Sequence, residues 1–349
     1  MTQTTSTAPP GAGSPRVARR SSAVRLLVRP EFGSLVGAIA VFAVFYAMAP
    51  TFRQATSWST ILYESATIGI MAVAVALLMI GGEFDLSAGV NVIACALFGA
   101  MFTYQFTLNV WVGVLAALCF GLVVGFVNGW LLVRTKLPSF LVTLSTFLML
   151  QGLNVAVTKL VTGSTATDKI YDMDGFDSAR ALFASEFTIG GVDVSIAVVW
   201  WLLFVAVATW VLLRTKVGNW IYAAGGDSAS ARAVGVPVNR VKIALFMLVG
   251  AAAWFSGMHL LFAYNTVQSG EGVGNELLYI MAAVIGGCLL TGGYGTAVGA
   301  GIGALIYGMT KQGIVYAGWD DNWLMFFVGA MLLLATVINA WVRRQAGRR

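Results

Sequence analysis

Charged side chains are scarce in this sequence. Only 10% of its 349 residues are Asp, Glu, Lys or Arg, and 58% are hydrophobic, whereas a typical soluble domain carries about 25% charged residues. So few charges cannot cover the surface of a water-soluble fold of this length. The composition therefore excludes an ordinary soluble protein and predicts a chain whose outer surface faces lipid.

The residues that build catalytic and metal sites are scarce as well. The sequence has one histidine, His259, and three cysteines, Cys95, Cys119 and Cys288, all inside apolar runs. It contains no HExxH, no Cys/His cluster, no GxSxG and no GxxxxGK[ST], so zinc catalysis, nucleophilic catalysis and a phosphate-binding loop have no support. We expect a chain that is no enzyme, with no catalytic residue, no metal and no cofactor. The three cysteines are expected to serve packing, and His259 to be a packed or hydrogen-bonded helix residue.

Long apolar runs make up most of the chain. About 20 residues at 1.5 Å rise cross the ~30 Å hydrocarbon core. Three of the runs are short and Gly-rich, which favours broken or re-entrant helices: 88–105, 277–291 and 296–314. We predict an all-α polytopic membrane protein of about ten spans, near 33–50, 60–81, 88–105, 108–134, 138–161, 194–213, 242–264, 277–291, 296–314 and 321–342.

The positive charges predict the orientation of these spans, because Lys and Arg are retained on the cytoplasmic side. With the N-terminus inside, the cytoplasmic segments hold 16 of the 21 basic residues, and the other side holds only Arg53, Lys159, Lys169, Arg180 and Lys311. Both termini are therefore expected in the cytoplasm. The domain scheme is a disordered basic tail at 1–30, a single transmembrane domain at 31–343 and a short basic tail at 344–349.

Two loops are long enough to carry function. The outer one, about 162–193, is polar and is either a docking surface or a solvated connector. The cytoplasmic one, about 214–241, has a more specific pattern: two glycines break the chain, Asp227 or Ser228 caps a helix near 229–234, and Gly235 with Pro237 ends it. We take its candidate functional residues to be Gly225, Gly226, Asp227, Ala231, Arg232 and Gly235.

Uncharged polar residues occur within the expected spans. Amides and hydroxyls can replace the hydration of a neutral polyol without the desolvation cost of a charge, and they serve equally well as hydrogen-bonding glue between helices. The candidates for lining a translocation pathway are Asn91, Asn128, Ser145, Thr146, Gln151 and Asn154. Among the acids, Glu64 alone lies inside a span, at a depth typical of either an interface-level acid or an ion-coupling group.

Three ordered motifs resemble the permease subunits of ATP-binding-cassette sugar importers of the ribose, xylose and galactoside type. The first is GEFDLSAG at 82–89, whose matching residues are Gly82, Asp85, Leu86, Ser87 and Gly89. The second is LPSFLVTLST at 137–146, and the third is GNWIYAAGGD at 218–227 continued by ARAVGV at 231–236. In the third, Asn219, Asp227 and Ser230 replace the family's usual Arg, Asn and Ala, which bears on partner choice more than on fold.

This resemblance implies a mechanism and partners. A periplasmic or lipid-anchored binding protein would deliver a sugar, and two permease chains in the lipid of the bacterial inner membrane would form the pathway. A cytoplasmic ATPase, which binds the ATP and Mg²⁺, would drive alternating access through the 228–234 helix. Nucleic acid is not an expected partner.

Other readings stay open at this level. An ion-coupled secondary carrier would use a buried acid such as Glu64, and related permeases carry branched-chain amino acids or nucleosides. A membrane enzyme or receptor has the least support, since no site can be assembled. The sequence also leaves open which sugar is carried and whether two identical permeases pair.

Overall fold

The structure is a computed structural model that describes residues 30–347. The expected N-terminal tail, apart from Pro30, lies outside the described residues, as do the last two residues of the expected C-terminal tail. The final helix continues to Gly347, past the expected end of the last span at 342.

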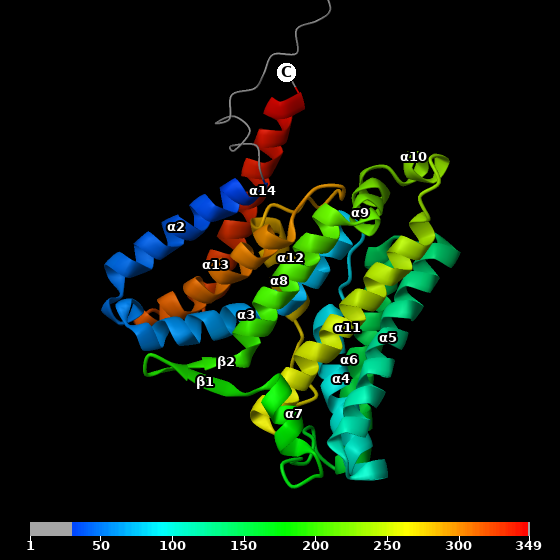
Figure 1. Ribbon diagram of the computed structural model, residues 1–349, viewed down its shortest axis with the longest axis vertical. Helices are drawn as coiled ribbons and strands as arrows, with labels where there is room; N and C mark the ends of the chain where they lie inside the picture. The colour runs from blue at the N-terminus through cyan, green and yellow to red at the C-terminus, as the bar shows by residue number, and fades with distance from the viewer. Residues whose placement is uncertain (1–29, 348–349) are drawn as a thin grey trace, which may run out of the picture.

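Each of the ten expected runs contains a helix (Figure 1). Seven of these helices are long and apolar enough to cross a membrane, the third of them together with a π turn at Thr103–Thr107, and two more are shorter and apolar. The chain is thus a helical polytopic membrane protein. The helices are α2 (Pro30–Met48), α3 (Ala55–Ile80), α4 (Ala88–Phe102), α5 (Val110–Thr135), α6 (Ser139–Thr162), α8 (Ile196–Arg214), α11 (Val238–Tyr264), α12 (Asn275–Ile285), α13 (Ala297–Tyr316) and α14 (Trp323–Gly347).

Helices α3 and α11 form the centre of the bundle. The most apolar stretches of α3 and α11 are 78% and 72% buried, whereas those of α5, α6 and α8 are only 33%, 28% and 28% buried. Close packing at the centre depends on small residues: Gly121 of α5 crosses Gly250 of α11 so closely that a Cβ at Gly250 would overlap the carbonyl oxygen of Gly121. The peripheral helices therefore expose apolar faces that suit lipid.

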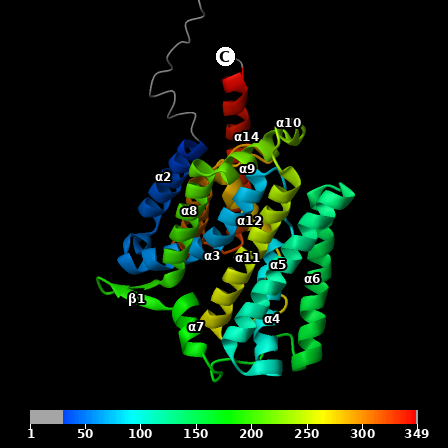
Figure 2. The ribbon, with the colours of Figure 1, turned by 45° about the vertical axis from the view of Figure 1, so that its right-hand side comes forward.

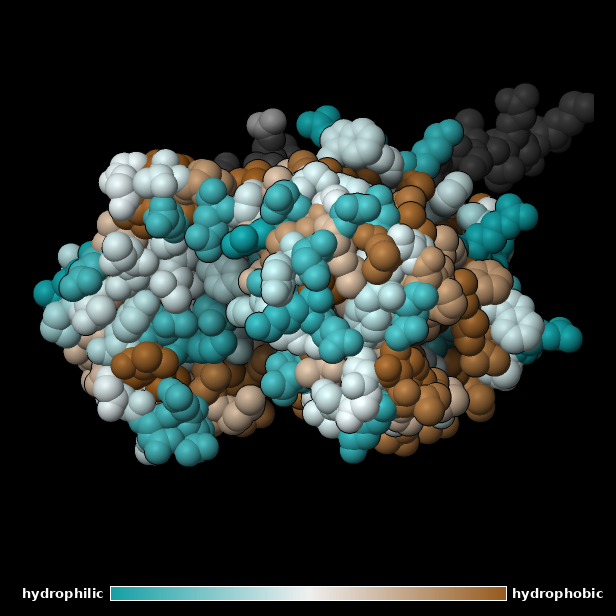
Figure 3. All heavy atoms as spheres, turned by 90° about the horizontal axis from the view of Figure 1, so that it is seen from below, coloured by the Kyte–Doolittle hydropathy of each residue, from teal (hydrophilic) through white to brown (hydrophobic). Residues whose placement is uncertain are grey.

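The outer loop is more structured than the sequence indicates. It contains a short helix, α7 (Phe176–Phe183), and an antiparallel hairpin of β1 (Glu186–Ile189) and β2 (Val192–Ser195). Phe183 is fully buried and stacks on Phe262 of α11, with ring centroids 5.7 Å apart. Contrary to the expectation from the sequence, the chain is therefore not entirely α-helical but contains this small hairpin. The loop packs on the bundle through Phe183. Figure 3 views this end of the molecule, where hydrophilic and hydrophobic residues are mixed over the surface.

The inner loop also differs from its prediction. Two helices occupy it, α9 (Lys216–Gly226) and α10 (Ser228–Ala233), and the chain breaks at Asp227. The expectation that Gly225 and Gly226 break the chain is wrong, because both lie within α9. These two helices lie at the same end of the molecule as the start of α2 and the end of α14, opposite α7 (Figures 1 and 2).

The cysteines and the histidine are partly as expected. Cys95 and Cys288 are buried, whereas Cys119 is exposed on the apolar surface of α5. His259 is buried in α11. The packing role predicted for all three cysteines therefore holds for two, because Cys119 lies on a peripheral helix.

Candidate functional site

The first motif forms a turn followed by a non-helical connection at 83–87, the extended segment. Helix α3 ends with Gly82 in the left-handed region, at φ +86°, and with the N–H of Glu83 donating to Leu78 O at 3.2 Å. This arrangement is the Schellman motif that needs glycine. The chain then runs without helical hydrogen bonds until α4 begins at Ala88.

Hydroxyls of α6 satisfy the backbone of this extended segment. The N–H of Phe84 donates to Ser139 Oγ at 3.2 Å, and the N–H of Leu86 donates to Thr143 Oγ1 at 3.1 Å. Backbone groups buried without a partner are costly. The Ser139 and Thr143 hydroxyls belong to the second motif, so the first two motifs are one structural unit.

A buried side-chain network joins the same two elements. Asp85 Oδ1 accepts from the N–H and the hydroxyl of Ser87, at 2.8 and 2.5 Å. Asn128 of α5 donates to Ser87 Oγ at 3.0 Å and accepts from Thr146 Oγ1 of α6 at 2.6 Å. All four side chains are buried. A fully paired network of this kind gives the extended segment one defined position.

The six candidate pathway residues do not gather into one site. Asn128 and Thr146 belong to the network just described. Asn154 donates to Val90 O at 3.2 Å, and Asn91 accepts from Cys95 Sγ at 3.7 Å. These four are buried; the bonds of Asn128, Thr146 and Asn154 join different elements, whereas that of Asn91 lies within α4. Ser145 is exposed and bonds only its own helix, and Gln151 is half-buried.

Three backbone segments meet at Gly225. A Cβ at this position would overlap the carbonyl oxygen of Ile80, at the end of α3. The same oxygen accepts from the N–H of Gly293, in the connection between α12 and α13, at 2.8 Å. The neighbouring Gly226 faces open space. Gly225 therefore joins the inner loop to the start of the first motif by direct backbone contact.

The far end of the first motif is equally tight. A Cβ at Gly89 in the first turn of α4 would overlap the carbonyl oxygen of Gly272 and approach the carboxylate of Glu276. The extended segment is thus held by close backbone packing at both of its ends, at Gly82 and at Gly89.

Helix α10 is capped as the sequence predicts. The Asp227 carboxylate accepts from the N–H of Ala229 at 2.9 Å and of Ser230 at 3.2 Å, and from the Ser230 hydroxyl at 2.5 Å. These hydrogen bonds, that of the Ser230 side chain first, lower the pKa of Asp227. Gly235 ends the helix at φ +87°, while Ala231 is buried and Arg232 is exposed. The result is a short, rigid helix with one outward cation.

A polar cleft of about 650 Å³ connects α10 with the extended segment. Glu83, the first residue after the turn, forms an ion pair there with Lys242 of α11, and the two side chains are only 11% and 14% exposed. Because the other charged groups are cations, the cleft carries net positive charge. Its lining includes Glu83, Leu132, Lys136, Arg232, Asn239 and Lys242.

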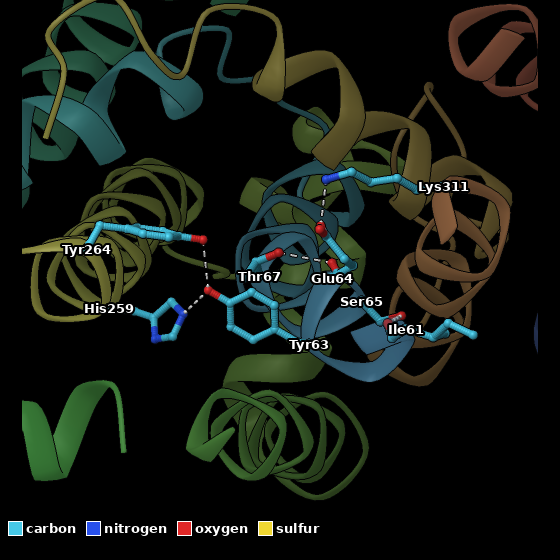
Figure 4. Close-up of polar contacts among 8 residues, drawn as sticks. All are labelled: Ile61, Tyr63, Glu64, Ser65, Thr67, His259, Tyr264 and Lys311. Atoms are coloured by element: carbon cyan, nitrogen blue, oxygen red, sulfur yellow. Dashed lines mark hydrogen bonds and ion pairs between the residues drawn. The ribbon is translucent and has the colours of Figure 1, made fainter. Parts of the chain in front are cut away.

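Glu64 is paired rather than free. Its carboxylate lies 2.7 Å from Nζ of Lys311 on α13, as Figure 4 shows. The pair is partly accessible, with the two side chains 20% and 36% exposed. The Lys311 ammonium therefore compensates the charge that Glu64 places within the span.

His259 belongs to a separate hydrogen-bonded chain with Tyr63 and Tyr264 (Figure 4). Its Nδ1 is 2.7 Å from Phe183 O, and because a carbonyl only accepts, Nδ1 is assigned the proton. Its Nε2 faces the Tyr63 hydroxyl at 3.3 Å, and that hydroxyl lies 3.3 Å from the Tyr264 hydroxyl. The hydrogen-bonded role predicted for His259 is confirmed. Among the described residues, no group of three or more His, Cys, Asp or Glu is placed to hold a metal.

The match to a known protein family spans all three motifs. The family described as the branched-chain amino acid transport system / permease component matches residues 57–336. The fructose import permease protein of Rhizobium meliloti is 29% identical over 84% of this chain and 81% of its own length. The ribose import permease protein of Escherichia coli K12 is 30% identical over 88% of this chain and 93% of its own length. The galactose/methyl galactoside import permease protein of the same strain is 28% identical over 89% of this chain and 94% of its own length. No solved structure matches the chain significantly.

Proposed function

This chain belongs to the family of branched-chain amino acid transport system / permease components, and on that premise we propose that it is the membrane-spanning subunit of an ATP-driven importer of a monosaccharide or similar polyol. It is a multi-pass protein of the inner membrane. The three relatives described above are import permeases for fructose, ribose and galactose/methyl galactoside, which favours a sugar over an amino acid.

The orientation follows from charge. The end that carries α9 and α10 holds Arg214, Lys216, Arg232, Arg240 and Lys242, and positive residues favour the cytoplasmic side. In this proposal about ten helices cross the membrane within one domain at 31–343. The ends of the chain and α10 lie in the cytoplasm, and α7 with the hairpin faces the binding protein.

One observation carries the mechanism: Arg232 of α10 and Glu83 of the extended segment line the same cleft. A cytoplasmic ATPase that binds ATP and Mg²⁺ would push on α10 as it closes. The push reaches the interior along two paths, through Gly225 to the end of α3 and through the cleft to Glu83. Capped ends keep α10 rigid, so that it transmits displacement instead of fraying.

The remaining partners follow from the same proposal. An external binding protein delivers the sugar, and a second permease chain, identical to the first, completes the pathway. In this proposal the binding of ATP and Mg²⁺ and the hydrolysis of ATP belong to the partner subunit, because the sequence contains no GxxxxGK[ST]. Roles in the pathway are left to the exposed polar side chains rather than to Asn128 and Thr146, which hold the extended segment.

Reconstitution tests the proposal. Permease, its cognate ATPase and a loaded binding protein are combined in liposomes, and ATP turnover and sugar uptake are measured together. We expect turnover to rise when the loaded binding protein is added. Uptake that persists with no ATPase in the liposomes would overturn the proposal. Thermal-shift screening of the binding protein against a sugar panel then identifies the substrate.

A further inference from the structure

An apolar groove of about 670 Å³ opens on the side of the bundle. Its back is α3 at Leu77, its sides are α8 at Val207 and α11 at Ala244, and α9 with Trp220 closes its cytoplasmic end. Figure 1 shows α8 and α11 in front of α3 with α9 across their ends. The one charged residue in the lining is Arg240.

The groove exists because α8 and α11 diverge. Both helices pack on α3. They meet near the outer end, where the ring of Phe255 lies 5.3 Å from that of Trp200 and 5.4 Å from that of Phe204. Toward α9 no aromatic pair joins them among the described residues, and Val207 and Ala244 are exposed on the two walls. The groove is therefore closed at the outer end by aromatic rings, and α8 and α11 stand apart between these rings and α9.

The length of the groove matches one leaflet of a membrane. On α11 its lining runs from Arg240 to Leu248, with Pro237 just before that helix. From 237 to 248 a rise of 1.5 Å per residue gives about 16 Å, and half of the hydrocarbon core is about 15 Å. A single acyl chain thus has the length that the groove offers.

The positive charges near α9 favour a lipid with an anionic headgroup. Arg240 lines the groove, Lys216 directly precedes Val217, which also lines it, and Arg214 is the last residue of α8. Residues 214–226 and 236–248 contain no Asp or Glu. The two ion pairs seen among the described residues involve Lys242 and Lys311 instead. Half-buried Trp220 beside Arg240 is typical of the membrane interface.

We propose that this groove binds one acyl chain of an anionic phospholipid, whose headgroup lies against Arg240. An apolar wall of one-leaflet length that ends at unneutralised cations is complementary to such a lipid. The proposal does not depend on the transport function. A bound lipid would hold α8, α9 and α11 apart on α3, next to the helix that leads to α10.

Native mass spectrometry of the full chain tests this proposal. The permease is purified in detergent and exposed to dioleoyl phosphatidylglycerol or to dioleoyl phosphatidylcholine. We expect phosphatidylglycerol to be retained several-fold better by the natural chain, Arg240→Ala to lose that preference, and Arg240→Lys to keep most of it. Arg232→Ala is the matched control, because Arg232 is an exposed cation at the same end that does not line the groove.

A second variant tests the apolar wall. Ala244→Trp places a large ring in the groove from an exposed position, so retention of both lipids should fall while the protein stays folded by gel filtration. Equal retention of the two lipids by the natural chain would overturn the proposal. So would an Ala244→Trp variant that retains lipid normally but no longer dimerises, because a second chain would then occupy the groove.

Discussion

Two cavities of nearly equal volume, about 650 and 670 Å³, flank the first turns of α11 and have opposite chemistry. Asn239 and Lys242, three positions apart on one helix face, line the polar cleft. Arg240, Val241 and Ala244 line the apolar groove. One helix therefore separates a charged space from a lipid-like one simply by its 3.6-residue period.

The difference between the cavities lies in what reaches them. The polar cleft is lined by residues of α10 and of the extended segment, so it connects the proposed ATPase contact to the interior of the bundle. The apolar groove is lined by α3, α8, α9 and α11 and opens on the side of the bundle. A charge pair such as Glu83–Lys242 is costly to bury, and its presence in one cavity alone suggests that this side carries the conformational signal. Four substitutions test the contrast.

Gly225→Ala should have the largest effect, because Gly225 of α9 touches the backbone at the end of α3. Overpacking costs about 1–3 kcal/mol where side chains can yield, and here a carbonyl oxygen stands in the way. We expect a large drop in thermal stability and loss of uptake. Gly226→Ala is the matched control, since its Cβ meets nothing. Equal behaviour of the two variants would contradict the backbone junction.

Glu83→Gln should come next. It leaves Lys242 charged and mostly buried in the polar cleft, and loss of one partner of a buried pair costs on the order of 3 kcal/mol. Thermal unfolding of the purified permease should show the loss. The double variant Glu83→Gln with Lys242→Met removes both charges and should recover part of it. A single variant as stable as the natural chain would show that the pair is not a structural anchor.

Arg232→Glu should act on coupling more than on stability. The side chain is exposed on α10, and surface charges contribute at most about 1 kcal/mol to folding. We expect normal membrane insertion and melting, with roughly tenfold lower stimulation of the partner's ATP turnover, corresponding to about 1.4 kcal/mol of lost contact. Arg240→Glu, on the groove side, should change turnover less. Normal uptake by Arg232→Glu would contradict a coupling role and would show that the inner loop only connects α8 to α11.

Glu64→Gln should have the smallest effect. Its pair with Lys311 is partly exposed, which limits its contribution to below about 1 kcal/mol. In an ATP-driven importer, uptake should stay within about twofold of the natural level and should not respond to a proton ionophore. Abolished uptake would favour the ion-coupled carrier and would make the Glu64–Lys311 pair, instead of the polar cleft, the functional charge pair.

Much of the fold could be predicted from local pattern. All ten expected runs contain helices, and Asp227, one of the two predicted caps, caps α10. These features depend on hydrophobic length and on hydrogen bonds within a few residues. The hairpin at 186–195 was missed because its short strands are stabilised by one another and by the docked loop. Gly225 and Gly226 were misread as a helix break, since nothing local shows that Gly225 packs against α3.

The sequence by itself determined that lipid surrounds this chain, roughly where it crosses, and which loop gathers positive charge, because these depend on composition and spacing alone. Only the tertiary structure decided what the polar residues do. Asn128, separated by 41 residues from Ser87, meets it and Thr146 in one network, and Glu83 meets Lys242 across 159 residues. Contacts at such separations depend on how helices pack, and no local pattern encodes them.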